Sequence, residues 1–172
     1  RYDVLYTYIL ARVQYWSQQA QQDGDKLLQR LLNASDKERN TAKKKQTAEL
    51  KKATKRKAEV DNLFAKMYED WSVGRITEYN FNMLSEKYQA EQHELDEKIQ
   101  ELQAELDAAV QTAVDAEKWI ELMKKYVNPT QLTAELLNAL IEKILIHEAV
   151  KHEDGTREQE VEIFYRFIGK VE

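Results

Sequence analysis

Between Asp25 and Asn128 the chain contains one glycine, Gly74, and no proline. Because glycine and proline are the residues that most readily end a helix, this stretch can form long helices on either side of Gly74. The whole chain of 172 residues has four glycines and one proline, and 33% of it is charged. Few turn residues and many charges predict a few long, solvated helices rather than a compact globule.

Residues 72–77 predict the turn of a helical hairpin. Gly74 can adopt the left-handed conformation that ends a helix, and Thr77 is a good N-cap for the next one. Ile76 and Phe81 then flank the new helix start at the spacing of a hydrophobic staple. A helix stop followed at once by a helix start places a tip near residues 72–77.

Apolar residues recur at heptad spacing on both sides of this predicted tip. The first helix carries Leu50, Ala53, Val60, Phe64, Met67 and Trp71, with Lys57 at one seam position. The second carries Leu95, Ile99, Leu102, Leu106, Ala109, Ala113, Ala116, Ile120, Met123 and Val127. These seams predict an antiparallel two-helix coiled coil over residues 25–127, with looser packing at 33–46, where the seam is weak.

The charge pattern supports the same pairing. Residues 36–57 contain ten basic and three acidic side chains, whereas residues 86–107 contain eight acidic and two basic ones. If the chain reverses at Gly74, these two windows face each other. A basic arm against an acidic arm would help to fix orientation and register.

The remaining segments predict a small α+β base. Residues 1–24 read as one helix that stops at Gly24, and residues 128–172 as a short helix from 133 to 143 followed by a β-hairpin. The strands would be 144–150 and 161–168, turning at Asp154-Gly155, with Ile146 opposite Ile163. The predicted fold class is therefore mainly α: a long antiparallel coiled-coil hairpin on a small α+β base with a C-terminal β-hairpin.

The tip of the hairpin is unusually apolar for a position far from a core. Its large side chains either seal the end of the coiled coil or form a contact surface for another molecule, and the sequence leaves both open. The candidate partner-interface residues are Tyr68, Trp71, Val73, Gly74, Arg75, Ile76, Tyr79 and Phe81.

A lysine-rich segment offers a second candidate site. Its side chains could bind DNA phosphates, or they could form a solvated face that the acidic arm neutralises. The candidate DNA-contact residues are Lys43, Lys44, Lys45, Lys51, Lys52 and Lys55.

The sequence offers little sign of catalysis or metal binding. His147 and His152 would face opposite sides of a strand, and His93 with Glu97 lacks a third ligand. No Ser/His/Asp arrangement, phosphate-binding glycine loop or nucleophilic cysteine is present, so we expect no catalytic residues, no metal site and no cofactor. The absence of cysteine suits a reducing compartment, and no signal peptide or membrane span is apparent.

Three segments together resemble a known protein family. They are Tyr68-Glu69-Asp70 with Gly74-Arg75-Ile76 and Phe81; Leu84 and Tyr88 with Glu91-Gln92 and Leu95; and Leu140 to Ile144 leading through His147-Glu148 and Asp154-Gly155 to the run from Ile163 to Gly169. This series resembles the coiled-coil region that follows the zinc ribbon in large serine recombinases, the site-specific integrases and transposon resolvases of bacterial mobile elements.

The resemblance implies a non-catalytic piece of a longer cytoplasmic bacterial enzyme, and the start at Arg1, within a helix, fits a fragment. The catalytic serine and the zinc would lie upstream, and DNA would be bound through those upstream domains. The coiled coil would meet coiled coils of other subunits, promote synapsis and help to set the direction of recombination, with a directionality factor as a further partner and no membrane. The alternatives are a DNA-binding helical module, or a structural spacer such as a toxin-like or cytoskeletal coiled coil.

Overall fold

The computed structural model describes residues 2–152 and 156–171 of the chain. Its contacts divide into two units, which we call the hairpin unit, Asp36–Val110, and the terminal unit, Arg1–Ser35 with Gln111–Glu172. Within the described residues, every helix is too short or too polar to cross a lipid bilayer.

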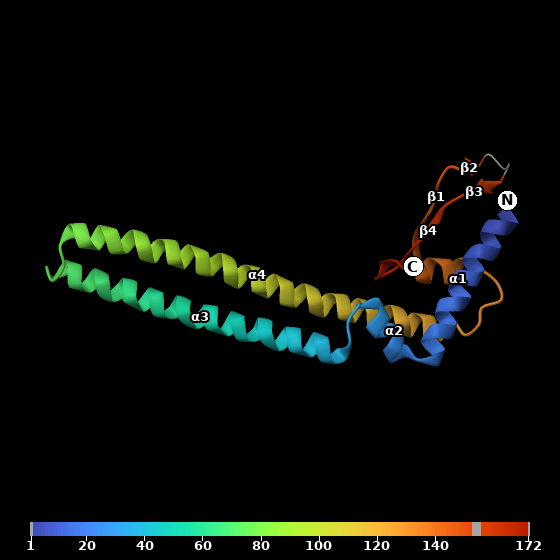
Figure 1. The fold of residues 1–172 in the computed structure, drawn as a ribbon. Coiled ribbons are helices and arrows are strands. Elements are labelled where there is room, and N and C mark those ends of the chain that lie inside the picture. Colours follow the sequence, from blue (N-terminus) through green and yellow to red (C-terminus); the bar gives the residue numbers. More distant parts are fainter. Residues whose placement is uncertain (1, 153–155, 172) are drawn as a thin grey trace. The chain divides into compact units, whose positions relative to one another are not determined.

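The hairpin unit consists of two long antiparallel helices. Helix α3 spans Asp36–Ser72, and helix α4 spans Glu78–Lys125 and so contributes to both units. Figure 1 shows the two helices side by side, joined by a short turn at residues 73–77. The predicted fold class and the predicted tip are therefore confirmed.

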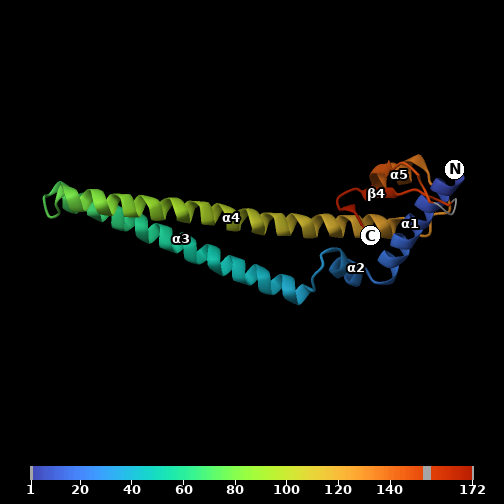
Figure 2. The same ribbon diagram turned by 45° about the horizontal axis from the view of Figure 1, so that its top comes forward.

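The heptad seam supplies the buried face of the hairpin unit. Ala53, Val60 and Met67 are buried on α3, and Leu102 is buried on α4. Between Asp36 and Lys52 no α3 residue is buried, and Figure 2 shows the two helices farther apart toward the start of α3. The weak seam in that part of the sequence accounts for this difference, since small and polar side chains bury little apolar surface.

The coiled coil begins later than we predicted from the sequence. Helix α2, Gly24–Leu31, is separate, and its Leu27 is buried in the core of the terminal unit. Asn33 takes the left-handed conformation (φ 51°), and the amides of Asn33 and Ala34 donate to the carbonyls of Arg30 and Gln29. An asparagine thus ends α2 in the way that glycine usually does, which corrects the predicted start at residue 25 to Asp36.

The first break in the chain also differs in detail. Helix α1, Tyr2–Gln22, ends close to the predicted position. Gly24 is not a left-handed stop, however, because it is the first residue of α2. Asp23 makes the break instead, since its carboxylate accepts a hydrogen bond from the Lys26 amide at 3.0 Å and caps the new helix.

The core of the terminal unit is built around three aromatic side chains. Trp16 of α1 meets Trp119 of α4 edge to face at 5.7 Å between ring centroids, and Trp119 meets Tyr165 at 5.5 Å. All three are almost completely buried. Polar side chains of α1 also satisfy carbonyls at the end of α4: Gln21 Nε2 donates to the Lys124 oxygen at 2.6 Å, and Ser17 donates to Tyr126.

The C-terminal part forms a helix and two small sheets. Helix α5 spans Ala134–Leu140, shorter than predicted, and Thr133 caps it, its hydroxyl accepting from the Leu136 amide at 3.1 Å. Strands β1 (Ile141–Ile146), β4 (Val161–Tyr165) and β5 (Gly169–Lys170) form one antiparallel sheet, ordered β1-β4-β5. Strands β2 (Val150–Lys151) and β3 (Arg157–Glu158) form the other.

The predicted register of the β-hairpin is wrong. Ile163 pairs with Ile144 rather than Ile146, and Ile146 pairs with Val161. Ile163 and Tyr165 lie in the core, but the two alignments differ by two residues, so each side chain keeps its face in either one. Backbone hydrogen bonds at both ends of the pair hold the observed alignment: the His147 amide donates to the Glu160 carbonyl at 3.0 Å, and the Arg166 amide donates to the Leu140 carbonyl at 2.9 Å. The predicted turn residues Asp154 and Gly155 lie outside the described residues.

Candidate protein-interaction site

The backbone of the hairpin tip is held by two complementary caps. Gly74 has a φ of 77°, its amide donates to the Trp71 carbonyl at 3.0 Å, and the Arg75 amide donates to the Asp70 carbonyl at 2.8 Å. This pair of hydrogen bonds is the Schellman motif that ends a helix at a left-handed glycine. Thr77 then starts α4, its hydroxyl accepting from the Asn80 amide at 3.3 Å.

Three aromatic rings from the two helices pack together at this tip. Trp71 of α3 stacks on Phe81 of α4, with 4.6 Å between centroids and 22° between planes. Tyr68 lies against both, at 5.9 Å from Trp71 and 6.5 Å from Phe81. The aromatic rings therefore pack across the two arms and close the end of the coiled coil, which is one of the two roles that the sequence left open.

Packing does not bury these side chains, however. Tyr79 remains 77% exposed, Val73 65% and Tyr68 54%, while Trp71 keeps about a third of its surface in solvent. Arg75 and Gly74 are exposed, and Ile76 and Phe81 are half-buried. The predicted tip residues thus lie together, and several present apolar surface outward while the aromatic cluster fixes their position.

Two features refine this surface beyond the sequence prediction. Met83 is 52% exposed one turn into α4, and sequence reasoning missed it because it lies off the heptad seam. An apolar residue off the seam in an otherwise charged helix was the signal that could have found it. Arg75 already makes a contact within the tip, because its guanidinium donates a hydrogen bond to the Asp70 carboxylate at 2.9 Å.

The two arms meet through charge near the seam. Arg56 of α3 donates two hydrogen bonds to the Glu91 carboxylate of α4, at 2.7 and 3.2 Å, and Lys57 pairs with Asp96. The hydrogen bonds with Arg56 lower the pKa of Glu91, and those with Glu91 raise the pKa of Arg56. These contacts follow the predicted orientation of a basic arm along an acidic one.

The candidate DNA-contact lysines behave differently from Arg56 and Lys57. Lys43, Lys44, Lys45, Lys51 and Lys52 are exposed, and among the described residues none lies within ion-pair distance of a carboxylate. Lys55 reaches only Glu59 of its own helix, at 4.0 Å. The acidic arm therefore does not pair directly with these lysines.

The histidines contact separate carboxylates rather than forming one site. His147 and His152 contact different carboxylates, those of Glu162 at 2.9 Å and Glu158 at 3.2 Å. His93 meets Glu97 on the surface of α4, at 3.3 Å. No ligand set shared by these histidines is found in the part of the chain described.

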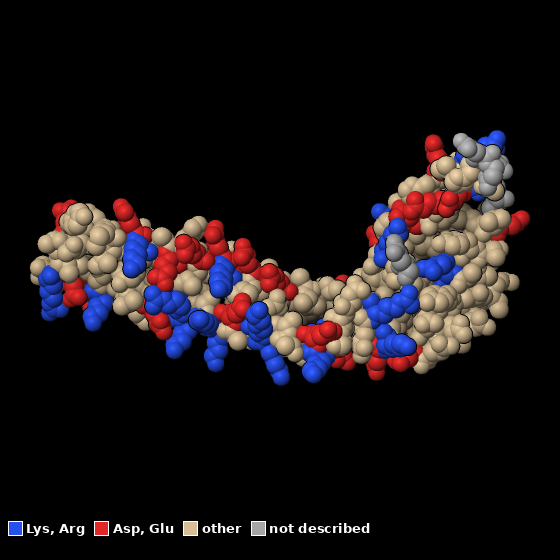
Figure 3. Space-filling view, in the orientation of Figure 1, with Lys and Arg blue, Asp and Glu red and all other residues tan. Residues whose placement is uncertain are grey.

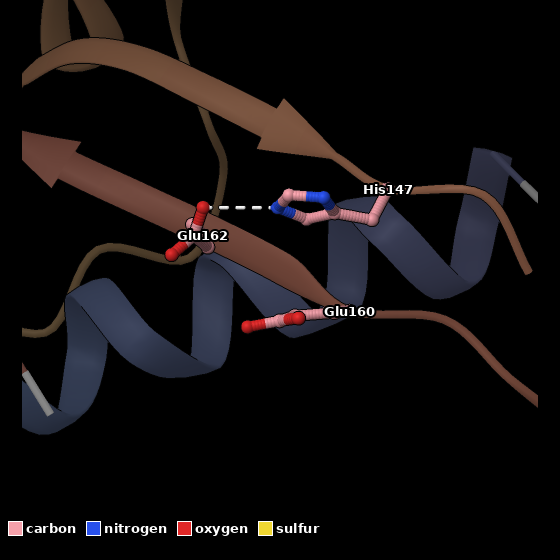
Figure 4. A group of neighbouring side chains, drawn as sticks. All are labelled: His147, Glu160 and Glu162. Carbon is pink, nitrogen blue, oxygen red and sulfur yellow. Dashed lines mark hydrogen bonds and ion pairs between the residues drawn. The ribbon is translucent and has the colours of Figure 1, made fainter.

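One of these pairs belongs to a larger cluster, shown in Figure 4: the ligand atoms of His147, Glu160 and Glu162 lie within 4.8 Å of one another. The Lys170 ammonium already contacts Glu162 at 2.6 Å, and this hydrogen bond, followed by that of His147, lowers the pKa of Glu162. Because the central carboxylate is matched by a lysine and the cluster is largely exposed, we read it as an ion-pair network and assign no metal to it.

Comparison with known proteins adds a single match. The model of a family described as "Domain of unknown function (DUF4368)" matches residues 105–172, which is less than half of the chain. The match covers the end of α4, α5 and the strands, and leaves the hairpin tip outside. Neither the curated proteins nor the solved structures contain a significant match to the chain.

Proposed function

We propose that this chain is a non-catalytic coiled-coil module of a large serine recombinase, whose hairpin tip binds the coiled coil of another subunit. Such a contact would promote synapsis of two DNA-bound dimers and help to control the direction of recombination. The proposal joins the sequence resemblance to the geometry of the tip, because neither the family match nor the fold alone assigns a function.

The exposed apolar tip is the observation that carries the proposal. Tyr68, Val73, Tyr79 and Met83 keep more than half of their surface in solvent at the end of a strongly charged coiled coil. Clustered exposed aromatic and apolar side chains are typical of protein contact surfaces, and tyrosine and tryptophan are enriched at their centres. A coiled coil that served only as a spacer would need the ring packing that closes its end, but not the apolar surface that stays in solvent.

A small tip surface also suits the proposed task. A few apolar side chains give a weak contact between free molecules. When subunits are held on one DNA complex, the high effective concentration strengthens the same contact without any new interaction. The tip could therefore act within an assembled complex and leave free subunits apart.

The test uses the most exposed tip residues, because Trp71 stacks on Phe81 and its removal would also disturb packing. The double variant Val73→Glu with Tyr79→Glu places charge on the surface and leaves the aromatic cluster in place. The matched control is Leu63→Glu with Val110→Glu, since both residues are exposed apolar positions outside the tip. Each pair is introduced into the parent recombinase, and paired-site synapsis and single-site DNA binding are measured.

We expect the tip variant to lose synapsis while it retains single-site DNA binding and helicity. The control variant should behave as the unmodified protein does. Normal synapsis by the tip variant would refute a tip contact and favour the spacer alternative. Equal loss by both variants would show that the tip has no special role.

A further inference from the structure

One face of α3 carries a row of exposed lysines that the coiled coil does not use. We call this row the outer basic ridge and define it as Lys44, Lys45, Lys51, Lys52 and Lys55, all of which are exposed. With 3.6 residues per turn, Lys44, Lys51 and Lys55 fall within about 40° of one another around the helix. Lys45 and Lys52 form a second column about a quarter-turn away.

The first column, Lys44, Lys51 and Lys55, lies on the side of α3 that points away from its partner helix, and the second column, Lys45 and Lys52, lies on its flank, about 60–100° from the seam. By the same helical spacing, the buried seam residues Ala53 and Val60 lie about 160–180° from Lys44 around α3. Arg56 and Lys57 lie closer to the seam on its two sides, which explains why these two cations reach carboxylates of α4. The lysines of the first column are on the opposite face and cannot do so.

The acidic arm is also too distant to cancel the ridge through solvent. Figure 3 shows lysine and arginine along one edge of the hairpin and aspartate and glutamate gathered toward the other. Packed helices are about 8–10 Å apart between axes, and the first column of the ridge projects away from the partner. At physiological salt the Debye length is about 8 Å, so the opposite charges are largely screened from one another.

From this placement we propose that the outer basic ridge binds the phosphate backbone of duplex DNA without regard to base sequence. From Lys44 to Lys55 the ridge extends about 17 Å along the helix. A DNA duplex carries about ten phosphate charges over that length. The site is distinct from the tip, and its function does not depend on a tip contact.

The composition of the face favours DNA over a second protein. The side chains beside the lysines, such as Asn40, Thr47 and Ala48, are small or polar, and one acidic residue, Glu59, pairs with Lys55 at 4.0 Å. Protein interfaces are depleted of lysine and need an apolar centre, which this face lacks. Long flexible ammonium side chains suit phosphate contacts, because these need charge more than fixed geometry.

The test compares two triple variants of the chain that change net charge equally. The ridge variant is Lys44→Gln, Lys51→Gln and Lys55→Gln. The control is Lys26→Gln, Lys87→Gln and Lys98→Gln, three exposed lysines that lie on other helices. Glutamine is a good helix former, and circular dichroism checks that both variants keep their helicity. Binding of a fluorescein-labelled duplex is followed by anisotropy over a salt series.

If each ridge lysine neutralises one phosphate, the affinity of the unmodified chain falls about 500-fold between about 50 and 200 mM salt. With two ridge lysines left, the same change in salt should lower affinity only about 12-fold. The control variant should keep the steep dependence, and an unlabelled duplex of unrelated sequence should compete equally well.

Several results would overturn the proposal. One is that the unmodified chain does not bind duplex DNA. Another is that the affinities of the ridge and control variants depend on salt with the same slope. Binding to anionic lipid vesicles but not to duplex DNA would assign the ridge to a membrane surface instead. Self-association that the ridge variant abolishes, without DNA binding, would assign it to a second copy of the chain.

Discussion

The hairpin turn allows a sharp test, because one residue has a conformation that only glycine adopts freely. At Gly74 (φ 77°) an added Cβ would meet no atom within 4 Å, so Gly74→Ala has a purely conformational effect. An L-residue in the left-handed region costs about 1–2 kcal/mol. Alanine also lowers the conformational entropy of the unfolded chain relative to glycine, and this offsets about 0.4–1 kcal/mol of the destabilisation. We therefore expect a net destabilisation of about 1 kcal/mol.

Gly24 provides a control of opposite sign. It lies in α2 without a left-handed φ, and its added Cβ would meet the end of the Lys124 side chain, with Nζ at 3.0 Å and Cε at 3.1 Å. A flexible lysine can move aside. Alanine is favoured over glycine in a helix by about 0.5–1 kcal/mol, so Gly24→Ala should leave stability unchanged or raise it by up to that amount.

Both variants are measured by urea unfolding, followed by far-ultraviolet circular dichroism, with amide hydrogen exchange to locate the effect. Exchange in the Gly74→Ala variant should accelerate around the tip, and Gly74→Asn should be intermediate, because asparagine tolerates the left-handed conformation better than alanine. If Gly74→Ala is as stable as the unmodified chain, residue 74 is not left-handed and the turn is not a Schellman motif.

Three further predictions concern the cores and the arms. Trp119→Ala should lower the free energy of unfolding by about 3–5 kcal/mol, since Trp119 is fully buried, whereas the exposed Glu117→Ala should change it by less than about 0.5 kcal/mol in the same urea assay. Burial raises the pKa of Tyr165 to about 12, so the folded state resists ionisation and stability should be lost as pH rises from about 10 to about 12. Denaturation at several pH values should show this loss, worth about 3 kcal/mol, and Tyr165→Phe should remove it. Arg56→Glu should lower the melting temperature at low salt by placing like charges together, and adding Glu91→Arg should restore it; the same pair of measurements at high salt should show a smaller effect.

The hairpin could be predicted from sequence because each of its signals is local. Gly74 and Thr77 determine the turn through hydrogen bonds to residues within five positions. The heptad pattern then needs only a partner, and the nearest partner is the neighbouring helix. Such short-range consistency is what allows a single sequence to predict long helices and their tip.

The remaining differences arise where the outcome depends on long-range packing or on a less specific residue. Asn33 ends α2, but asparagine takes the left-handed conformation far less regularly than glycine, so its position alone did not predict a helix end. The β-hairpin register is not determined by which face of β4 is buried, because the predicted alignment, two residues away, leaves Ile163 and Tyr165 on the same face. A prediction based on the turn alone could not include the backbone hydrogen bonds at the two ends of the strand pair.

The charges of the two arms show most clearly what a count along the sequence misses. A count of charged residues predicts that the acidic arm neutralises the basic one, because the net charges of the two facing windows nearly cancel. Among the described residues, however, ion pairs between the two arms form where a side chain leaves the helix beside the seam, as those of Arg56 and Lys57 do. Lys44 and Lys51 are on the far face, where the helical period directs them into solvent whatever the opposite arm contains. The basic residues of α3 are therefore of two kinds: some bind carboxylates of the acidic arm and hold the arms together, and others face solvent, where they can bind a polyanion such as DNA.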